Sequence, residues 1–386
     1  MTYDPEKRFD TPLALKLKDE IQSLGPIGLE KYIVACLLDP FLGYYRTKDA
    51  IGRSGDFITA PEISQVFGEL LGLWCAVVWQ QMGSPLHVNL IELGPGRGTL
   101  MADALRAARL KPEFLKAIEV HLVEASDVLR EKQRSRLAQF DVPVRWHDTL
   151  AQVPPAPAIV IANEFLDALA MSQWRWQNGA WYKVMVGFNA RGVLDFVLGE
   201  RGSPAAGPVS RFLKPEEGDV LELKQYSELI CALANRSRTH PVAALFLDYG
   251  HTDHQYGDTL QGVRAHSFEH PLSSPGQADL SNQVDFAALL GDVTAQGLRA
   301  QGPITQCEFL TALGIMERTS RLMSTNPGKA ATVEAGVARL MAPSGMGTRF
   351  KVMGVRSPQL PELPGLTVAA LAQCKTRFKA DNRSGV

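Results

Sequence analysis

The chain lacks the features of several protein classes. Its 386 residues hold five cysteines, which form no C-x-x-C pair, so the usual zinc-binding and thioredoxin-like patterns are absent. No apolar run approaches the length of a membrane-spanning helix, and the N-terminus has no apolar signal core. Forty basic residues stand against 41 acidic ones without a block of either sign. Neither nucleic acid nor membrane insertion is therefore expected.

The remaining composition is that of an ordinary globular chain. Hydrophobic residues make up 45% and charged residues 21%, and the length allows one large domain with insertions or two domains. The cysteines are scattered in apolar surroundings, as Cys36 is between Ala35 and Leu37. Acidic residues occur from Asp4 onward, unlike in a transit peptide. These observations predict free thiols and a cytoplasmic protein.

The most informative stretch joins an apolar strand to a glycine-rich turn and a helix. The strand is expected over 88–93, and Gly94, Gly96 and Gly98 follow it at alternate positions. Helix-forming sequence then runs from Leu100 to about Arg109. Strand, turn and helix in this order predict the first unit of a nucleotide-binding α/β fold.

The spacing of the glycines indicates which cofactor is bound. A dinucleotide fingerprint requires glycine at position 99, where Thr99 stands, and this opposes an NAD-dependent oxidoreductase. Glu92 lies two residues before the first glycine. The pattern Glu-x-Gly-x-Gly-x-Gly resembles motif I of the Rossmann-like methyltransferases that use S-adenosylmethionine. The ammonium and the sulfonium of that cofactor make an acid at the entrance of the turn favourable.

Two further acids follow predicted strands. The segment 118–124 reads as the second strand and ends in Glu124, whose carboxylate could accept both ribose hydroxyls. The segment 142–148 is a plausible third strand, with Asp148 placed to meet the adenine amine. A solvated acid at a strand end is the alternative interpretation for both.

Candidate catalytic acids follow the fourth strand, an apolar run over 158–162. Asn163, Glu164 and Asp167 come just past its end, where residues of a central parallel strand face the ligand crevice. A carboxylate can clamp the planar fork of an arginine side chain, so this pair suits a guanidinium substrate. A helix N-cap formed by Asn163 is the alternative, and both can hold together.

Several longer motifs resemble one family. The sequence is similar to the MidA-type methyltransferases in Asp39-Pro40-x-x-Gly43-Tyr44-Tyr45, Gly55-Asp56-Phe57-x-Thr59-Ala60-Pro61-Glu62-Ile63-Ser64, Ala162-Asn163-Glu164-Phe165-x-Asp167-Ala168, Asp248-Tyr249-Gly250 and Ala278-Asp279-Leu280-Ser281. These blocks span about residues 28–355. The mitochondrial members of this family are arginine methyltransferases that assist assembly of respiratory complex I. The resemblance therefore implies an arginine on a complex I subunit as the substrate.

The predicted site residues fall into three groups. The catalytic candidates are Glu164, Asp167 and Asn163; the cofactor-binding candidates are Glu92, Gly94, Gly96, Gly98, Thr99, Glu124, Asp148, Asp56 and Thr59; the substrate-lining candidates are Glu62, Asp248, Tyr249 and His251. His251 and His254 lack the helix that a zinc motif of this spacing requires, and no metal is expected.

The predicted fold is an α/β class I methyltransferase sheet of Rossmann type with an N-terminal helical cap and an antiparallel β insertion. The division is 1–62 for the cap and its loop, 63–170 and 226–358 for the core, 171–225 for the insertion on the substrate side, and 359–386 for a tail. Two helices over residues 13–38 are expected to pack over the nucleotide fold. A cofactor-binding assembly factor without catalysis and a small-molecule methyltransferase are the alternatives, because a fold does not define its substrate.

Overall fold

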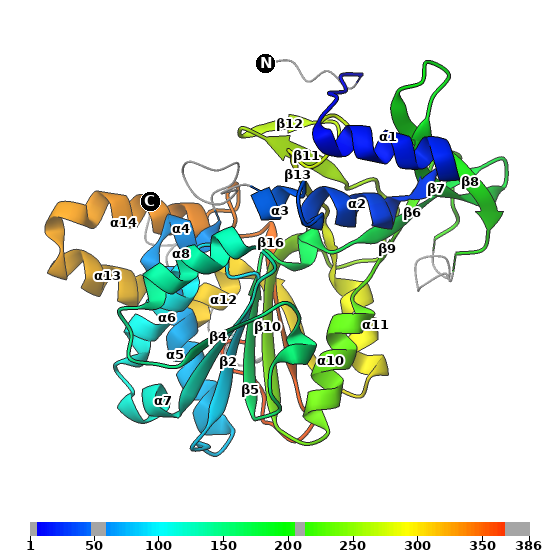
Figure 1. The fold of residues 1–386 in the computed structure, drawn as a ribbon. Coiled ribbons are helices and arrows are strands. Elements are labelled where there is room, and N and C mark those ends of the chain that lie inside the picture. Colours follow the sequence, from blue (N-terminus) through cyan, green and yellow to red (C-terminus); the bar gives the residue numbers. More distant parts are fainter. Residues whose placement is uncertain (1–5, 48–58, 205–212, 367–386) are drawn as a thin grey trace, which may run out of the picture.

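An eight-stranded sheet, seven strands of which lie side by side in one path, runs through the centre of the computed structural model, which describes residues 6–47, 59–204 and 213–366 (Figure 1). In spatial order the strands are β15 (Arg299–Thr305), β16 (Phe350–Arg356), β10 (Val242–His251), β5 (Ala158–Asn163), β2 (Val88–Leu93), β3 (Ile118–Val123) and β4 (Val144–His147). The strands from β4 to β10 are parallel, whereas β16 is antiparallel to both β10 and β15. The short β14 (Val284–Asp285) pairs with the end of β10.

Buried apolar side chains on both faces hold the sheet between helices. Every residue of β2 and β5 is buried, as expected for central parallel strands. One core contains side chains of α5 (Gln65–Gln81), α6 (Thr99–Ala108), α7 (Pro112–Ala117) and α8 (Asp127–Leu137). The opposite core contains side chains of η1 (Leu150–Gln152), η2 (Leu166–Ala168), α10 (Ser227–Ser237) and α11 (Phe286–Ala295). Figure 1 shows α5 and α6 on one side of the sheet, and α10 and α11 on the other.

A helical segment separates β15 from β16. It comprises α12 (Gln306–Ala312), α13 (Ile315–Thr325), η3 (Pro327–Lys329) and α14 (Ala330–Met341). A capping box between Thr305 and Glu308 starts α12. A Cβ added at Gly336 would lie 2.8 Å from the carbonyl oxygen of Ile63, so α14 packs closely on α4 (Ala60–Ile63).

The N-terminal helices and the insertion form a second layer. The insertion strands are β6 (Met171–Gln177), β7 (Ala180–Phe188), β8 (Leu194–Gly202) and β9 (Val220–Lys224), and β1 (Ile27–Gly28) joins them by pairing with β7. α1 (Pro12–Leu24) and α2 (Leu29–Leu38) share one core with the insertion residues Met171 and Val186. The two helices were expected to pack over the nucleotide fold, but they pack mainly on the insertion. Their buried apolar side chains form a common core with apolar side chains of the insertion strands.

Several short elements of this layer were not predicted from the sequence. These are α3 (Tyr44–Thr47), β11 (Gln261–Arg264), β12 (Ser267–Glu269) and β13 (Asp279–Ser281), the last three forming a small sheet. Segments of three or four residues are too short to show a period in their hydrophobic pattern. The Tyr32 hydroxyl of α2 donates to the carbonyl oxygen of Pro271 at 2.8 Å, which ties the segment between β12 and β13 to the cap.

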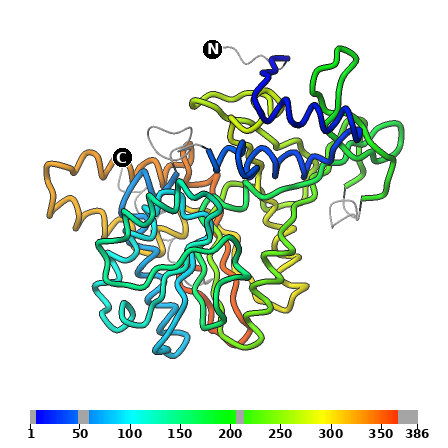
Figure 2. Tube along the Cα trace, viewed as in Figure 1, coloured from blue at the N-terminus to red at the C-terminus, as the bar shows by residue number. Residues whose placement is uncertain are grey.

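The predicted fold class is confirmed in its core, helical cap and insertion (Figure 2). The antiparallel insertion includes a hairpin at the Asn178-Gly179 turn, with Trp176 opposite Trp181. The proposed division into domains stays a prediction. Of the C-terminal tail predicted over 359–386, residues 367–386 lie outside the described part of the chain.

Gly72 tests the packing of α5 on α6. A Cβ at Gly72 would lie 2.4 Å from the carbonyl oxygen of Ala104. We expect Gly72→Ala to lower the free energy of unfolding by about 1–3 kcal/mol, because the backbone must move.

The exposed Gly291 of α11 has no described atom within 4 Å of an added Cβ. The control Gly291→Ala should therefore stabilise by about 0.5–1 kcal/mol. Urea unfolding measures both, and a Gly72→Ala protein as stable as the wild type would contradict this packing.

Candidate active site

The glycine-rich turn follows β2 in a conformation that requires glycine. Gly94, Gly96 and Gly98 have positive φ values of 62°, 53° and 73°, which residues with a Cβ rarely adopt. At Gly94 an added Cβ would also lie 2.9 Å from Cδ2 of Phe165. Gly98 is the N-cap of α6, so the turn ends where the helix begins.

Gln133 of α8 joins this turn to the neighbouring strands, and sequence analysis missed it. Its fully buried amide donates from Nε2 to the carbonyl oxygen of Gly96 at 2.7 Å and to Oε2 of Glu124 at 3.1 Å. Its Oε1 accepts from Nε1 of Trp146 at 2.8 Å. A signal was available, because buried leucines lie one helical turn before and after it on α8.

Glu124 lies just past β3 as a buried carboxylate that accepts hydrogen bonds at both oxygens. Oε1 accepts from the N–H of Ser126 at 2.8 Å, and Oε2 accepts from Gln133. Burial raises the pKa of Glu124 to about 7. Each oxygen keeps a second lone pair, so the carboxylate can still receive two hydroxyl donors.

Asp148 has a more exposed position than the other predicted acids. Its side chain is 60% exposed, and its Oδ1 forms an ion pair with the guanidinium of Arg130 at 2.6 Å. The same guanidinium donates from Nε to the carbonyl oxygen of Glu124 at 2.8 Å. Asp148 is thus held beside Glu124, and its contact with an adenine stays a prediction.

A pocket lies between the glycine-rich turn, the end of β5 and α4. Its lining is Thr59, Pro61, Glu62, Glu92, Gly94, Pro95, Gly96, Arg97, Thr99, Leu100, Asn163 and Glu164. The Thr99 hydroxyl is bonded to Oε1 of Glu62 and to the guanidinium of Arg136, which links α4 to the first turn of α6. The pocket therefore brings together half of the predicted site residues, namely Thr59, Glu62, Glu92, Gly94, Gly96, Thr99, Asn163 and Glu164. Asp56, predicted to bind the cofactor, lies outside the described residues.

Two oxygens in this pocket indicate a missing partner. Oε2 of Glu92 and Oδ1 of Asn163 are buried and have no hydrogen-bond partner among the described residues. Burial, followed by the charge of Glu124, raises the pKa of Glu92 to about 8. Buried polar atoms without partners are rare in folded proteins. Both oxygens therefore point to a ligand that carries hydrogen-bond donors.

Glu164 has a strained backbone and a constrained carboxylate. Its φ of 51° is left-handed, which costs a residue other than glycine about 1–3 kcal/mol and is typical of functional sites. Oε1 accepts from the N–H of Ala60 at 2.9 Å and from Nδ2 of Asn163 at 3.1 Å. Oε2 accepts no hydrogen bond from the residues that the structure describes. Burial raises the pKa of Glu164 to about 7.

Asp248 does not line the substrate side as predicted, because it is buried behind the turn after Glu164. Its Oδ2 accepts from the three successive N–H groups of residues 165–167 at 2.9–3.2 Å. Its Oδ1 accepts from the N–H of Tyr249 at 2.9 Å. Burial raises the pKa of Asp248, while these donors stabilise its ionised form. The carboxylate holds the turn in place.

Asp167 lies in that turn beside a group of tyrosines. Burial raises the pKa of Asp167 to about 6, and the Tyr249 hydroxyl is hydrogen-bonded to its carboxylate. The Tyr45 hydroxyl donates to Oδ1 of Asp279 at 2.8 Å. Burial, followed by the charges of Asp279 and Asp167, raises the pKa of Tyr45. Tyr45 and Asp279 belong to the family motifs, and their place beside the site was not predicted from the sequence.

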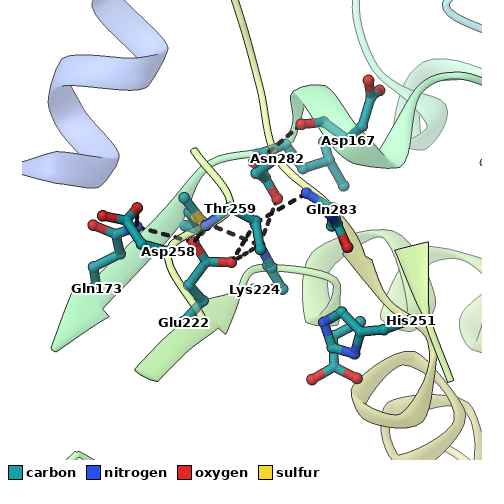
Figure 3. Close-up of polar contacts among 12 residues, drawn as sticks. Asp167, Gln173, Glu222, Lys224, His251, Asp258, Thr259, Asn282 and Gln283 are labelled. Carbon is teal, nitrogen blue, oxygen red and sulfur yellow. Dashed lines mark hydrogen bonds and ion pairs between the residues drawn. The ribbon is translucent and has the colours of Figure 1, made fainter. Parts of the chain in front are cut away.

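His251 lies apart from these acids. Its Nδ1 lies 2.8 Å from the carbonyl oxygen of Asp253, and Figure 3 shows the ring separated from the contacts around Asp167. In the described part of the chain no three His, Cys, Asp or Glu side chains form a group that could hold a metal ion. No helix within residues 6–47, 59–204 and 213–366 is long and apolar enough to cross a membrane.

The pocket fits a cofactor that carries positive charge and hydroxyl groups. It lies between β2 and β5, where the strand order reverses, which is where open α/β sheets bind ligands. Glu92 and Asn163 would face the cationic end of S-adenosylmethionine, and Glu124 would accept from its ribose. The strand order, the glycine-rich turn and these acids define a class I methyltransferase that depends on S-adenosylmethionine.

Comparison with known families gives the same assignment. The family described as "Putative S-adenosyl-L-methionine-dependent methyltransferase" matches residues 70–304. This match covers more than half of the chain. The chain belongs to this family of S-adenosylmethionine-dependent methyltransferases.

Curated relatives resemble nearly the whole chain. Protein arginine methyltransferase NDUFAF7, mitochondrial, of Mus musculus is 37% identical over 88% of this chain and 83% of that protein. The protein of the same name in Homo sapiens is 36% identical over 90% of this chain and 84% of its own length. The resemblance to the MidA-type family and its arginine methyltransferases, inferred from the motifs, is therefore confirmed.

Two solved structures share the fold. A protein from Burkholderia thailandensis, described as a "likely methyl transferase" and bound to S-adenosyl-homocysteine, superposes with a TM-score of 0.81 at 25% identity; the match covers 94% of this chain and 98% of that one. A native crystal structure from the same organism has a TM-score of 0.78, also at 25% identity and with the same coverage. The neighbour bound to S-adenosyl-homocysteine supports the predicted cofactor.

The predicted cytoplasmic location is wrong by comparison with these relatives. The curated proteins that match are named as mitochondrial. The prediction depended on acidic residues near the N-terminus and on the lack of a signal core. Those features concern only a short stretch at the start of the sequence, whereas the relatives named as mitochondrial match nearly the whole chain.

Glu92 should link cofactor binding to pH. Its pKa of about 8 leaves the carboxyl mostly protonated at pH 7 in the ligand-free protein. A cationic ligand favours the ionised form, so binding should release protons. The Glu92 contribution to affinity should rise between about pH 6 and 8, by less than about ten-fold per unit. Calorimetric titration of S-adenosylmethionine in two buffers of different ionisation enthalpy measures this release.

The control for this prediction is Glu92→Gln, whose amide does not titrate. On cofactor binding this variant should release fewer protons than the wild type, because Glu92 no longer contributes. Protons released by Glu124 should still be observed. Equal proton release by the wild type and the variant would show that Glu92 does not face the cationic end of the cofactor.

Proposed function

We propose that this methyltransferase transfers methyl groups to arginine side chains of a protein, with a subunit of respiratory complex I as the substrate. The observation that carries the proposal is the pair of acids in the turn after β5, in which Glu164 lines the cofactor pocket and Asp167 follows three residues later. The names of the curated relatives support protein arginine as the target. The complex I subunit follows from the family resemblance.

The constrained carboxylate of Glu164 suits a guanidinium. Oε1 is occupied by Ala60 and Asn163, which orients Oε2 toward an incoming donor. Arginine keeps its charge in proteins and presents several N–H groups in one plane. A carboxylate that accepts from this fork fixes its plane and draws positive charge toward the bonded N–H groups.

Asp167 offers a second carboxylate at the same turn. With a pKa of about 6 it is largely ionised near neutral pH, while Glu164, with a pKa of about 7, is close to half ionised. A bound guanidinium favours the ionised form of both acids. Either carboxylate can then accept the proton that the guanidinium nitrogen loses. When bound, S-adenosylmethionine supplies an electrophilic methyl carbon, so the protein mainly has to align the two reactants.

Glu164→Gln tests this role. The amide keeps the shape of the side chain but loses the negative charge, and we expect kcat to fall by about 100-fold or more. Wild-type kcat/KM should rise with pH through about 7 as Glu164 of the free enzyme ionises, and the variant should lose this rise. The measurement is transfer of labelled methyl groups to isolated complex I subunits, with methylarginine identified by mass spectrometry.

The matched control is Glu131→Gln, at an exposed glutamate outside the site, which should retain full activity. The affinity for S-adenosylmethionine should be similar in all three proteins. Methylation of another residue type would contradict the arginine proposal. If the wild type binds the cofactor but transfers no methyl group, a cofactor-binding assembly factor becomes the better account.

A further inference from the structure

A buried lysine lies between the insertion and the predicted catalytic turn. Lys224, the last residue of β9, has a side chain that is only 3% exposed. Its Nζ donates to Oε2 of Glu222 at 2.7 Å, to Oδ1 of Asn282 at 2.6 Å and to Sδ of Met171 at 3.1 Å. An ammonium has three donors, so each has found an acceptor. Figure 3 shows Lys224 at the centre of these contacts.

Such a buried ion pair is weak evidence for stability. Removing two charges from water costs about as much as their attraction returns, and apolar replacements are often equally stable. Burial lowers the pKa of Lys224, and the charge of Glu222 opposes this change. A role in specifying one local conformation explains the pair better than a gain in stability.

Glu222 ties the lysine to the rest of the second layer. Its Oε1 accepts from Nε2 of Gln173 at 2.9 Å and from the N–H of Thr259 at 2.8 Å. Its Oε2 accepts from Oγ1 of Thr259 at 2.7 Å as well as from Lys224. The ammonium is therefore fixed relative to β6, β9 and the segment before β11.

Asn282 passes this constraint on to the turn. Its side chain is buried, and Nδ2 donates to the carbonyl oxygens of Asp167 at 2.7 Å and Leu169 at 3.2 Å. Its own N–H also donates to the carbonyl oxygen of Asp167 at 2.9 Å. Because an ammonium can only donate, Lys224 keeps Oδ1 on its own side and directs Nδ2 to the turn. In Figure 3 the Asp167 carboxylate points away from this contact.

The turn is thus held from two sides. Asp248 of the central sheet binds its N–H groups, and Asn282 binds its carbonyl groups. We propose that Lys224 and Asn282 are positioning residues for methyl transfer, which hold the turn of Glu164 and Asp167 at the cofactor pocket. This inference rests on the proposed function, because that function makes the turn catalytic.

Two substitutions test the inference. Asn282→Asp keeps the shape of the side chain and the pairing with Lys224, but it replaces the N–H donors by an oxygen that repels the carbonyl groups. Lys224→Met removes the charge that orients the amide. The control is Lys183→Met, because Lys183 forms a half-buried ion pair with Glu30 in the same layer at 2.6 Å and does not contact the turn.

Three quantities are measured for each full-length protein: amide hydrogen exchange of residues 165–169, the affinity for S-adenosylmethionine, and kcat for labelled methyl transfer to isolated complex I subunits. We expect both test variants to exchange these amides at least about ten-fold faster. We also expect kcat to fall at least about ten-fold, while the cofactor Kd stays within about two-fold. Lys183→Met should match the wild type in all three.

Unchanged amide exchange in Asn282→Asp would overturn the inference, and so would faster exchange with unchanged kcat. A parallel loss of cofactor affinity would also overturn it, because that result indicates a general structural role. If Lys224→Met does not fold, Asn282→Asp decides alone, since it leaves the Lys224–Glu222 pair intact. If the wild type methylates no arginine, the proposed function fails, and amide exchange still decides whether these residues hold the turn.

Discussion

The burial of several carboxylates at the carboxyl edge of one sheet is the constraint on which the rest of the structure depends. Glu92, Glu124, Glu164, Asp167 and Asp248 lie there with raised pKa values, and burial is the largest cause in each case. For such acids the folded state binds protons more tightly than the unfolded state, so their contribution to stability decreases as pH rises through the raised pKa. A cationic ligand stabilises the ionised carboxylates and so offsets the free energy that their burial costs. The free protein is therefore suited to bind a sulfonium cofactor and a guanidinium.

Amide and N–H donors keep these acids in place. The Gln133 amide donates both to Glu124 and to the glycine-rich turn. The carboxylate predicted to bind the ribose and the turn therefore cannot move independently. Asp248 and Asn282 fix the two polar edges of the turn after β5, which allows Glu164 its left-handed backbone. The insertion contributes to this arrangement through Lys224, whose ammonium donates to Oδ1 of Asn282.

Local patterns in the sequence predicted the strands, the glycine-rich turn and the acids that follow them, because each rests on neighbouring residues. Lys224 and Asn282 were missed, since their roles depend on contacts between segments distant in the chain. Gln133 was missed although buried leucines one turn before and after it place it on the inner face of α8. Asp248 was expected to line the substrate side, because its position near the end of β10 was clear from the sequence but the direction of its side chain was not. The small sheet around β11 is too short to be found by periodicity.

The most direct test of the central claim is a crystal structure of the protein with S-adenosyl-homocysteine and an arginine-containing peptide from a methylated subunit. The account predicts the arginine guanidinium within about 3 Å of Oε2 of Glu164, with the turn of residues 164–168 unmoved and Glu92 beside the cationic end of the cofactor. A guanidinium bound elsewhere, or a Glu164 carboxylate turned away from the peptide, would contradict it.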